Sequence, residues 1–241
     1  MFRKDDELTE AASIDRVSDV AAVKAAIAAS LKAAQTHTAP YRHWTLAGML
    51  PDDVVDALMA LPFEAQETHG VSGKRELHND TRTYFDQSNI ERLPVFEAVA
   101  RAFHDGGIVE AVARATGADL DGTLLRIEYA VDKTGYWNKP HTDLGVKRLT
   151  LLHYLAEDGQ EDLGSDIYSA EDRWVKRVPF RRNEALMFVP SDSTWHGFEQ
   201  RPIAGVRKSL IINYVTEDWH DRWQLSYADQ PVRSLTRPRK A

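Results

Sequence analysis

The chain has 241 residues, of which 43% are hydrophobic and 28% charged, as is usual for a soluble globular protein with one sizeable core. Its formal net charge of -7 at pH 7 argues against tight binding to nucleic-acid phosphates, and the absence of cysteine excludes disulfides, thiolate metal sites and cysteine nucleophiles. No apolar run approaches the roughly 20 residues that span a bilayer, and the acidic start lacks a signal-peptide core. We therefore expect one cytoplasmic domain with no membrane or nucleic-acid partner, and the sequence leaves its oligomeric state open.

The first half of the chain, residues 1–120, has a mainly helical pattern. Alanine-rich sequence with valine, isoleucine and leucine at helical spacing favours an amphipathic helix over residues 15–35. Pro51 followed by two aspartates is typical of a helix start, and the Gly106-Gly107 pair should divide a helix predicted over 93–115. Two short strands are also expected here, over 41–50 and 82–85.

From residue 122 onward the chain changes to short β-type runs separated by turn residues. Helices followed by many short strands indicate an α+β fold, mainly β, in which a jelly roll is buttressed by helices. We expect residues 121–220 to form this jelly-roll core and residues 221–241 to form a C-terminal tail, frayed from Arg233 onward. The predicted strands are 124–131, 141–143, 149–155, 166–168, 174–178, 185–189, 195–198 and 210–215.

An H-x-D motif opens the β-rich half, with His141 and Asp143 two residues apart. On a β-strand such residues point to the same side, so both can bind one metal ion. His196 lies 53 positions beyond Asp143 (196 − 143) and completes the two histidines and one carboxylate that hold non-haem Fe(II) on one face. Arg207, 11 positions further (207 − 196), adds a fixed positive charge that can grip a carboxylate. The predicted metal ligands are therefore His141, Asp143 and His196.

A second H-x-D motif, His78 and Asp80, shows that the motif alone does not identify the site. It lies in a polar stretch before the β-rich half, and no spaced arginine of its own follows it. His141 instead opens a long β-type segment and precedes both His196 and Arg207. The context therefore favours the His141 motif as the metal site and leaves the role of His78 and Asp80 open.

Six segments, in their order and spacing, carry a family resemblance: 126–129, 134–136, 141–143, 149–155, 196 and 206–210. Over about residues 124–215 they resemble the iron(II)/2-oxoglutarate-dependent oxygenases, in particular the prolyl 4-hydroxylase-like branch. The resemblance implies a double-stranded β-helix, the cofactors Fe(II), 2-oxoglutarate and O2, and hydroxylation of an unactivated C–H bond with release of succinate and CO2. Two loops depart from the family, which often has Gly-Gly where Leu163-Gly164-Ser165 stand and glycine where Asn183-Glu184 stand.

The resemblance also implies roles for individual residues. Arg207 would hold the far carboxylate of 2-oxoglutarate, assisted by Ser209 on the same strand face and by Tyr154. Lys208 would point the other way. Tyr129 matches a family position beside the pocket, where it would either contact the cosubstrate or serve as plain aromatic packing. Pocket-shaping or substrate-facing positions are expected at Arg82, Tyr84, Arg126, Tyr136, Trp137 and Trp195, and His153 is expected in the core.

Two alternatives remain open at this stage. A cupin-like dioxygenase would use a similar metal site without 2-oxoglutarate, and a non-catalytic jelly-roll module would bind a metal in order to sense or scaffold. Succinate formation distinguishes all three. The substrate class is also open, because a small molecule and a peptidyl residue are both compatible with the sequence.

Overall fold

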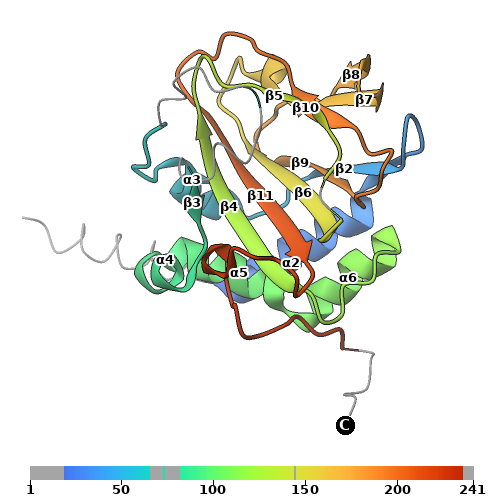
Figure 1. Ribbon diagram of the computed structural model, residues 1–241. Coiled ribbons are helices and arrows are strands. Elements are labelled where there is room, and N and C mark those ends of the chain that lie inside the picture. Colours follow the sequence, from blue (N-terminus) through green and yellow to red (C-terminus); the bar gives the residue numbers. More distant parts are fainter. Residues whose placement is uncertain (1–18, 66–72, 74–81, 144, 236–241) are drawn as a thin grey trace, which may run out of the picture.

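Two β-sheets pack against each other, and helices gather on the outer side of the larger one (Figure 1). The computed structural model describes residues 19–65, 73, 82–143 and 145–235. The larger sheet contains β1 (Gln35–His37), β2 (His43–Ala47), β3 (Thr83–Tyr84), β4 (Leu124–Asp132), β6 (Lys147–Leu155), β9 (Glu184–Phe188) and β11 (Arg207–Val215). The smaller sheet contains β5 (Asn138–His141), β7 (Asp166–Ala170), β8 (Arg173–Arg177) and β10 (His196–Phe198).

The strand order is β1-β2-β9-β6-β11-β4-β3 in the larger sheet and β5-β10-β7-β8 in the smaller one. All pairings between these strands are antiparallel. The last strand, β11, lies between β4 and β6, so strands far apart in the sequence form the centre of the sheet. This arrangement confirms the predicted jelly-roll α+β fold.

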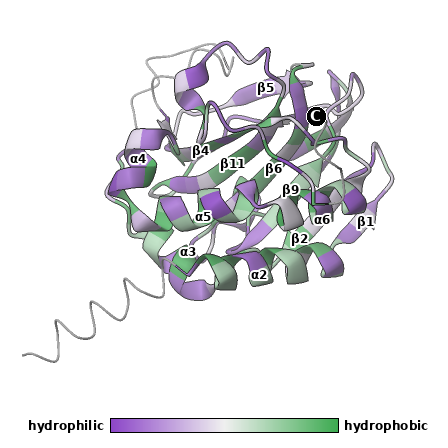
Figure 2. Cartoon of the chain, turned by 90° about the horizontal axis from the view of Figure 1, so that it is seen from below, coloured by the Kyte–Doolittle hydropathy of each residue, from purple (hydrophilic) through white to green (hydrophobic). Residues whose placement is uncertain are grey.

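The helices are α2 (Val20–Ala33), α3 (Asp52–Met59), α4 (Gln87–Arg92), α5 (Pro94–His104) and α6 (Gly106–Thr116), with short 3-10 turns η2 (Glu161–Leu163) and η3 (Arg222–Gln224). Asp19 caps α2 by accepting from Ala21 and Ala22 backbone N–H groups. Asp105 follows α5 and caps α6, which confirms that the helix predicted over 93–115 is divided there. Hydrophobic and hydrophilic residues alternate around these helices (Figure 2), as in helices that bury one side. None of the described helices is long and apolar enough to cross a membrane.

Alternating residues of the central strands face the two sides of the larger sheet. On β6 and β11, Leu149, Leu151 and Ile212 face the helices and form the main apolar core with residues such as Val99 and Phe103 of α5. The residues between them face the smaller sheet. On that side Tyr154 and Phe188 join Ile167 and Phe198 of the smaller sheet in a second apolar cluster. Because one side of the sheet packs on the helices, the predicted helix-buttressed sheet is confirmed.

The residues expected to begin a C-terminal tail are packed. Leu225 forms a β-bridge with Arg126 on β4 and is 2% exposed. Val232 is fully buried and exchanges backbone hydrogen bonds with Gly122 and Thr123. The described C-terminal segment therefore covers the lower end of β4, and the expectation of a tail from residue 221 was wrong for these residues.

Candidate metal and cosubstrate site

His141 and His196 stand directly opposite each other, because β5 and β10 pair antiparallel with these two residues in register. Their ring centroids are 4.3 Å apart. Asp143 adds a carboxylate, and one potential ligand atom from each of the three side chains lies within 4.8 Å of the others. Among the described residues, no other group of three or more His, Cys, Asp or Glu side chains is clustered in this way. The structure thus brings together the three residues singled out by the motif.

Asp143 is positioned differently from the expectation. β5 ends at His141, so the predicted strand over 141–143 was wrong in its extent and strand alternation does not orient Asp143. Instead, Thr150 on β6 donates from its Oγ1 to Asp143 Oδ2 at 2.5 Å, and the Lys147 ammonium pairs with Oδ1. Burial favours the protonated acid, but Lys147 and the other positive and hydrogen-bonding neighbours outweigh it and hold the pKa of Asp143 well below its usual range.

Lys147 reaches Asp143 because β6 contains a bulge. Tyr214 on β11 pairs with Leu149, but the next residue, Val215, pairs with Lys147, so Arg148 is an extra residue in the strand. A bulge of this kind re-aims the side chains beyond it. Simple alternation would place Lys147 on the helix side together with Leu149, and the bulge turns it into the site. Regular strand spacing gave no signal for this residue.

Both histidines are fixed through their second ring nitrogen. His141 Nδ1 lies 2.9 Å from the carbonyl oxygen of Lys139, and His196 Nδ1 lies 3.0 Å from that of Thr194. A carbonyl only accepts, so each Nδ1 carries a proton, which leaves Nε2 as the nitrogen available to a metal. Burial, reinforced by His196, lowers the pKa of His141 to about 3, so its imidazole is neutral. Neutral imidazoles held in this way are the form that binds a metal.

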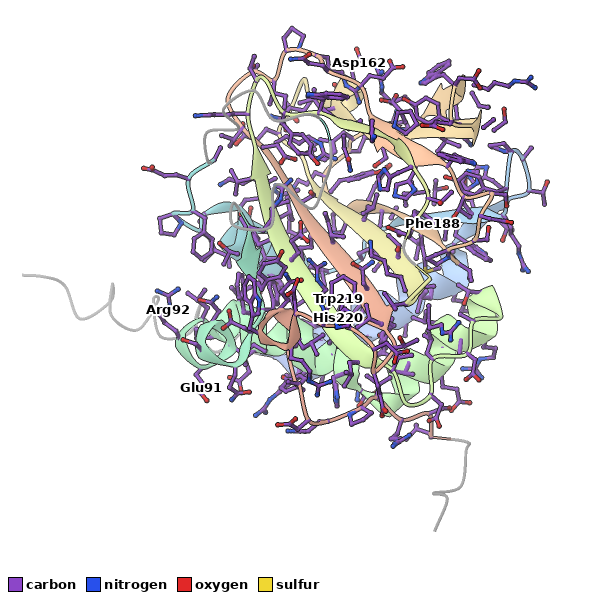
Figure 3. The ribbon with its side chains drawn as sticks, viewed as in Figure 1. Glu91, Arg92, Asp162, Phe188, Trp219 and His220 are labelled. Carbon is purple, nitrogen blue, oxygen red and sulfur yellow. The ribbon has the colours of Figure 1, made fainter. Side chains whose placement is uncertain are left out.

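One cavity joins these three side chains to Arg207. Its lining also includes Ser209 and Ser165, the apolar side chains Leu152 and Ile211, and the ring of Phe198. Phe188, labelled in Figure 3 between the two sheets, packs its ring 4.7 Å from that of His196. The cavity therefore places a cationic and hydroxyl-bearing wall beside the two histidines and the carboxylate, with apolar surface between them.

Arg207 is buried and already engaged by the protein. Its Nε donates to the carbonyl of Leu163 at 2.7 Å, and its Nη1 donates to Asp132 Oδ2 at 2.7 Å. The guanidinium also lies over the rings of Phe180 and Phe198, each at 4.8 Å. As expected, Ser209 lines the same cavity, whereas Lys208 points away and donates to the carbonyl of Met59.

Tyr154 lies beside this wall rather than on the cavity surface. It is fully buried, its hydroxyl donates to Ser165 Oγ at 3.0 Å, and its ring packs on Phe180. Burial raises the pKa of Tyr154, although Ser165 and the nearby positive charge of Arg207 oppose the shift. Tyr154 is therefore a neutral hydroxyl close to the arginine, linked to the cavity through Ser165.

The cosubstrate role expected for Tyr129 was wrong. Tyr129 points from β4 toward the helices, where its hydroxyl donates to the Leu58 carbonyl at 2.7 Å and its ring contacts Phe63 and Phe96. Burial raises the pKa of Tyr129 above its ordinary value. The physical reason is strand parity: the cavity-facing residues of β4 are the even-numbered ones, including Asp132.

The remaining candidates from the sequence fall into those that line the cavity and those that do not. Tyr136 and Arg82 line the cavity, as expected. His153 faces the helix side and its Nε2 lies 3.1 Å from Asn183 Oδ1, so it is a core residue. The following candidates lie outside the cavity lining: Tyr84, Arg126, Trp137 and Trp195. His78 and Asp80 lie outside the described residues.

A chain of buried ion pairs follows the cavity-facing side of β4. Asp132 accepts from Arg207 through Oδ2 and from Arg82 through Oδ1, the latter at 2.6 Å. Arg82 Nε also lies 3.4 Å from Glu128, and Glu128 accepts from Arg126 at 2.8 Å. Burial alone would lower the pKa of Arg82, but the two carboxylates and Tyr136 raise it instead. Sequence reasoning missed Asp132 and Glu128, although they lie six and two positions beyond Arg126 (132 − 126 and 128 − 126), a spacing that marks one strand face.

Local packing explains the residues found in the two loops that depart from the family pattern. A Cβ on Gly164 would lie 1.6 Å from the carbonyl oxygen of Val178, so only glycine fits there. Asn183 has a left-handed backbone with φ of 59°, a conformation that asparagine tolerates. Its amide also exchanges hydrogen bonds with the backbone of Leu50 at 3.0 and 2.7 Å. One loop therefore keeps a glycine where no side chain fits, and in the other Asn183 adopts the left-handed backbone that glycine would favour.

The donor set fits a non-haem Fe(II) ion. Two imidazole nitrogens and one carboxylate lie close enough to share one ion, and two histidines with one carboxylate form the facial set that such iron prefers. The wall beside these donors carries Arg207 and Ser209, a guanidinium and a hydroxyl of the kinds that bind the carboxylate of a keto dicarboxylate.

Comparison with known proteins gives the fold. No protein-family model and no curated protein matches the chain. Among solved structures, the chain is similar to a prolyl 4-hydroxylase from Phytophthora capsici, with TM-score 0.56 and 16% identity over 82% of this chain. It spans 65% of the length of that protein. It is also similar to a prolyl hydroxylase from Trichoplax adhaerens in complex with a hypoxia inducible factor peptide fragment, with TM-score 0.52 and 15% identity over 89% of this chain and 94% of that one. The chain therefore has the jelly-roll fold that these two prolyl hydroxylases share.

Proposed function

We propose that the protein is an Fe(II)- and 2-oxoglutarate-dependent dioxygenase that hydroxylates an unactivated C–H bond of a small molecule or peptidyl residue. The observation that carries this proposal is the meeting, in one cavity, of the His141, Asp143 and His196 donors with the buried Arg207. The fold shared with prolyl 4-hydroxylases supports it.

In this proposal His141, Asp143 and His196 hold Fe(II), and Arg207 with Ser209 binds the far carboxylate of 2-oxoglutarate. When bound, this pair of cofactors supplies the oxidising chemistry, in which O2 and 2-oxoglutarate give succinate, CO2 and a hydroxylated substrate. The protein fixes the geometry: the Lys139 and Thr194 carbonyls orient the two imidazoles through their Nδ1 atoms.

The cavity walls complete the proposed role of the chain. Leu152, Ile211 and Phe198 are apolar surfaces that limit water beside the donors. Thr150 and Lys147 hold the two oxygens of Asp143, which fixes the orientation of this carboxylate toward the two histidines. The Trichoplax protein was solved with a peptide fragment, which supports keeping a peptidyl substrate among the candidates.

Anaerobic equilibrium dialysis followed by aerobic turnover tests the proposal. The protein should bind one equivalent of Fe(II), then 2-oxoglutarate with a weak visible charge-transfer band, and should release succinate when O2 is admitted. Iron binding without 2-oxoglutarate binding would instead favour a cupin-like dioxygenase. Binding of both without succinate, across pools of small molecules and peptides, would favour a non-catalytic module.

A further inference from the structure

Arg207 has little room to receive a carboxylate as it stands. A guanidinium grips a carboxylate with two nitrogens, either Nε with Nη2 or Nη1 with Nη2. Its Nε is held by the Leu163 carbonyl and its Nη1 by Asp132, at 2.7 Å each. Each of the two gripping edges therefore already has one nitrogen occupied. Asp132 also neutralises the guanidinium charge, so a two-point grip on an incoming carboxylate is strongest when one of these protein partners withdraws.

The Leu163 carbonyl is poorly suited to withdraw. It is a backbone group next to Gly164, whose Cα is packed so tightly on Val178 that no Cβ fits. The same short segment continues to Ser165, whose Oγ accepts from the buried Tyr154. Movement of Leu163 would disturb these contacts together, so the Nε edge of Arg207 stays occupied.

Asp132 can withdraw from Arg207 without losing a charged partner. Its second oxygen already accepts from Arg82 at 2.6 Å, and both side chains are nearly inaccessible to solvent, at 3% and 2%. Arg82, Asp132 and Arg207 together carry a formal charge of +1, which one additional carboxylate would neutralise. Arg82 also lines the cavity, so both arginines are close to an incoming anion.

We propose that Asp132 is an internal competitor for the cosubstrate carboxylate at Arg207, and that Arg82 retains Asp132 when the cosubstrate binds. The inference rests on the proposed function, because it assigns the incoming carboxylate to 2-oxoglutarate. Asp132 is then an affinity-determining residue: it keeps Arg207 paired in the free protein and weakens cosubstrate binding by the strength of that pairing.

Two substitutions should change 2-oxoglutarate affinity in opposite directions. Asp132→Asn leaves a single acceptor oxygen for two arginines, so Arg207 is released and 2-oxoglutarate should bind about tenfold to a hundredfold more tightly, the range of a charge-assisted hydrogen bond. Arg82→Met removes the alternative partner of Asp132, which then pairs with Arg207 alone, so binding should weaken by at least about tenfold.

Lys208→Met is the matched control. Lys208 is next to Arg207 on β11, but it points to the other side of the sheet and donates to the carbonyl of Met59. This change should leave 2-oxoglutarate affinity within about twofold of wild type, because the side chain does not line the cavity. In the Asp132→Asn background, Arg82→Met should no longer weaken binding, since the competitor is absent.

The measurement is the dissociation constant of 2-oxoglutarate for Fe(II)-loaded protein, determined anaerobically by calorimetry, with folding checked by circular dichroism. Equal or weaker binding by Asp132→Asn would overturn the inference. If that variant does not fold, unchanged or tighter binding by Arg82→Met would overturn it instead. Wild-type protein that binds iron but no 2-oxoglutarate would contradict the proposed function itself, so the two failures are distinguishable.

Discussion

The two faces of strands β4, β6 and β11 differ in the chemistry of their buried side chains although they share one backbone. The face toward the helices carries apolar side chains such as Leu151 and Ile212 and belongs to the main core. The face toward the smaller sheet carries ionised or polar residues, including Asp132, Arg207 and Asn213, and these are as deeply buried as the apolar ones.

This difference separates stability from chemistry within a single sheet. Burial of the apolar face stabilises the fold at roughly 25 cal/mol per Å². Buried charges on the opposite face contribute much less to net stability, because desolvation offsets most of their attraction. They do, however, present fixed cations and donors to a ligand. Substitutions on the two faces should therefore have different consequences even at neighbouring positions.

The largest expected effect is a loss of stability on the helix face. Leu151→Ala should lower the free energy of unfolding by about 4 kcal/mol, through lost burial and the cavity that remains. Leu151 is 1% exposed and packs in the main core. Urea unfolding checks this value. The neighbouring cavity-facing substitution Leu152→Ala should reduce stability clearly less, and equal losses at both positions would contradict the division between the faces.

The second largest expected effect is a loss of 2-oxoglutarate affinity on the cavity face. Arg207→Ala should weaken 2-oxoglutarate binding by about 3 kcal/mol, because a buried carboxylate would lose its charged partner, and should leave iron affinity nearly unchanged. Calorimetry on the Fe(II)-loaded protein measures both quantities. Lys208→Ala, at the adjacent position on the opposite face, serves as the control. Wild-type cosubstrate affinity in the Arg207 variant would remove this arginine from the site.

A pH effect should arise from the helix face. Burial lowers the pKa of His153 to about 4, despite a hydrogen bond with Asn183 that raises it. The unfolded chain therefore takes up a proton below an ordinary pKa near 6.5 while the folded protein does not, so stability falls as the pH is lowered through that window. Between about pH 7.5 and 4.5 this group should remove about 2 kcal/mol of stability. In His153→Gln, the pH dependence of unfolding should be smaller by that amount, and an identical pH profile would show that His153 does not remain neutral in the fold.

The smallest expected effect is a loss of stability at Asn183, in the loop directly before β9. Asn183→Ala should be about 1 kcal/mol less stable than Asn183→Gly, because both lose the hydrogen bonds to Leu50 but only alanine resists the left-handed backbone. Thermal unfolding compares the two variants directly. Equal melting temperatures would mean that the left-handed conformation is not retained.

The sequence predicted much of this arrangement because periodicity reports burial. Helical spacing located α2 and α5, and strand alternation placed Ser209 and Lys208 on opposite faces. The H-x-D motif identified His141 and Asp143 because ligand chemistry restricts residue types. The cosubstrate role that the resemblance gives Tyr154 stays a prediction, because its hydroxyl lies near Arg207 but off the cavity surface.

The sequence could not show which alternate residues of β4 face the cavity, and it could not show that β6 contains a bulge. Tyr129 was assigned to the site from its position in a pattern, yet a register that buries Ile127 against the helices buries Tyr129 there as well. Lys147 was missed because a bulge breaks the alternation that was used to assign faces. Pairings such as Asp132 with Arg207 depend on residues 75 positions apart, and only the assembled sheet brings them together.

Substitution of three histidines, one at a time, gives the most direct test of the central assignment. Iron content should be measured by metal analysis after anaerobic loading of wild type, His141→Ala, His153→Gln and His78→Ala, together with circular dichroism of each. The account predicts near-stoichiometric iron in wild type and in the His153 and His78 variants, and loss of iron from a folded His141→Ala. Iron retained by the His141 variant and lost from either of the other two would contradict the account.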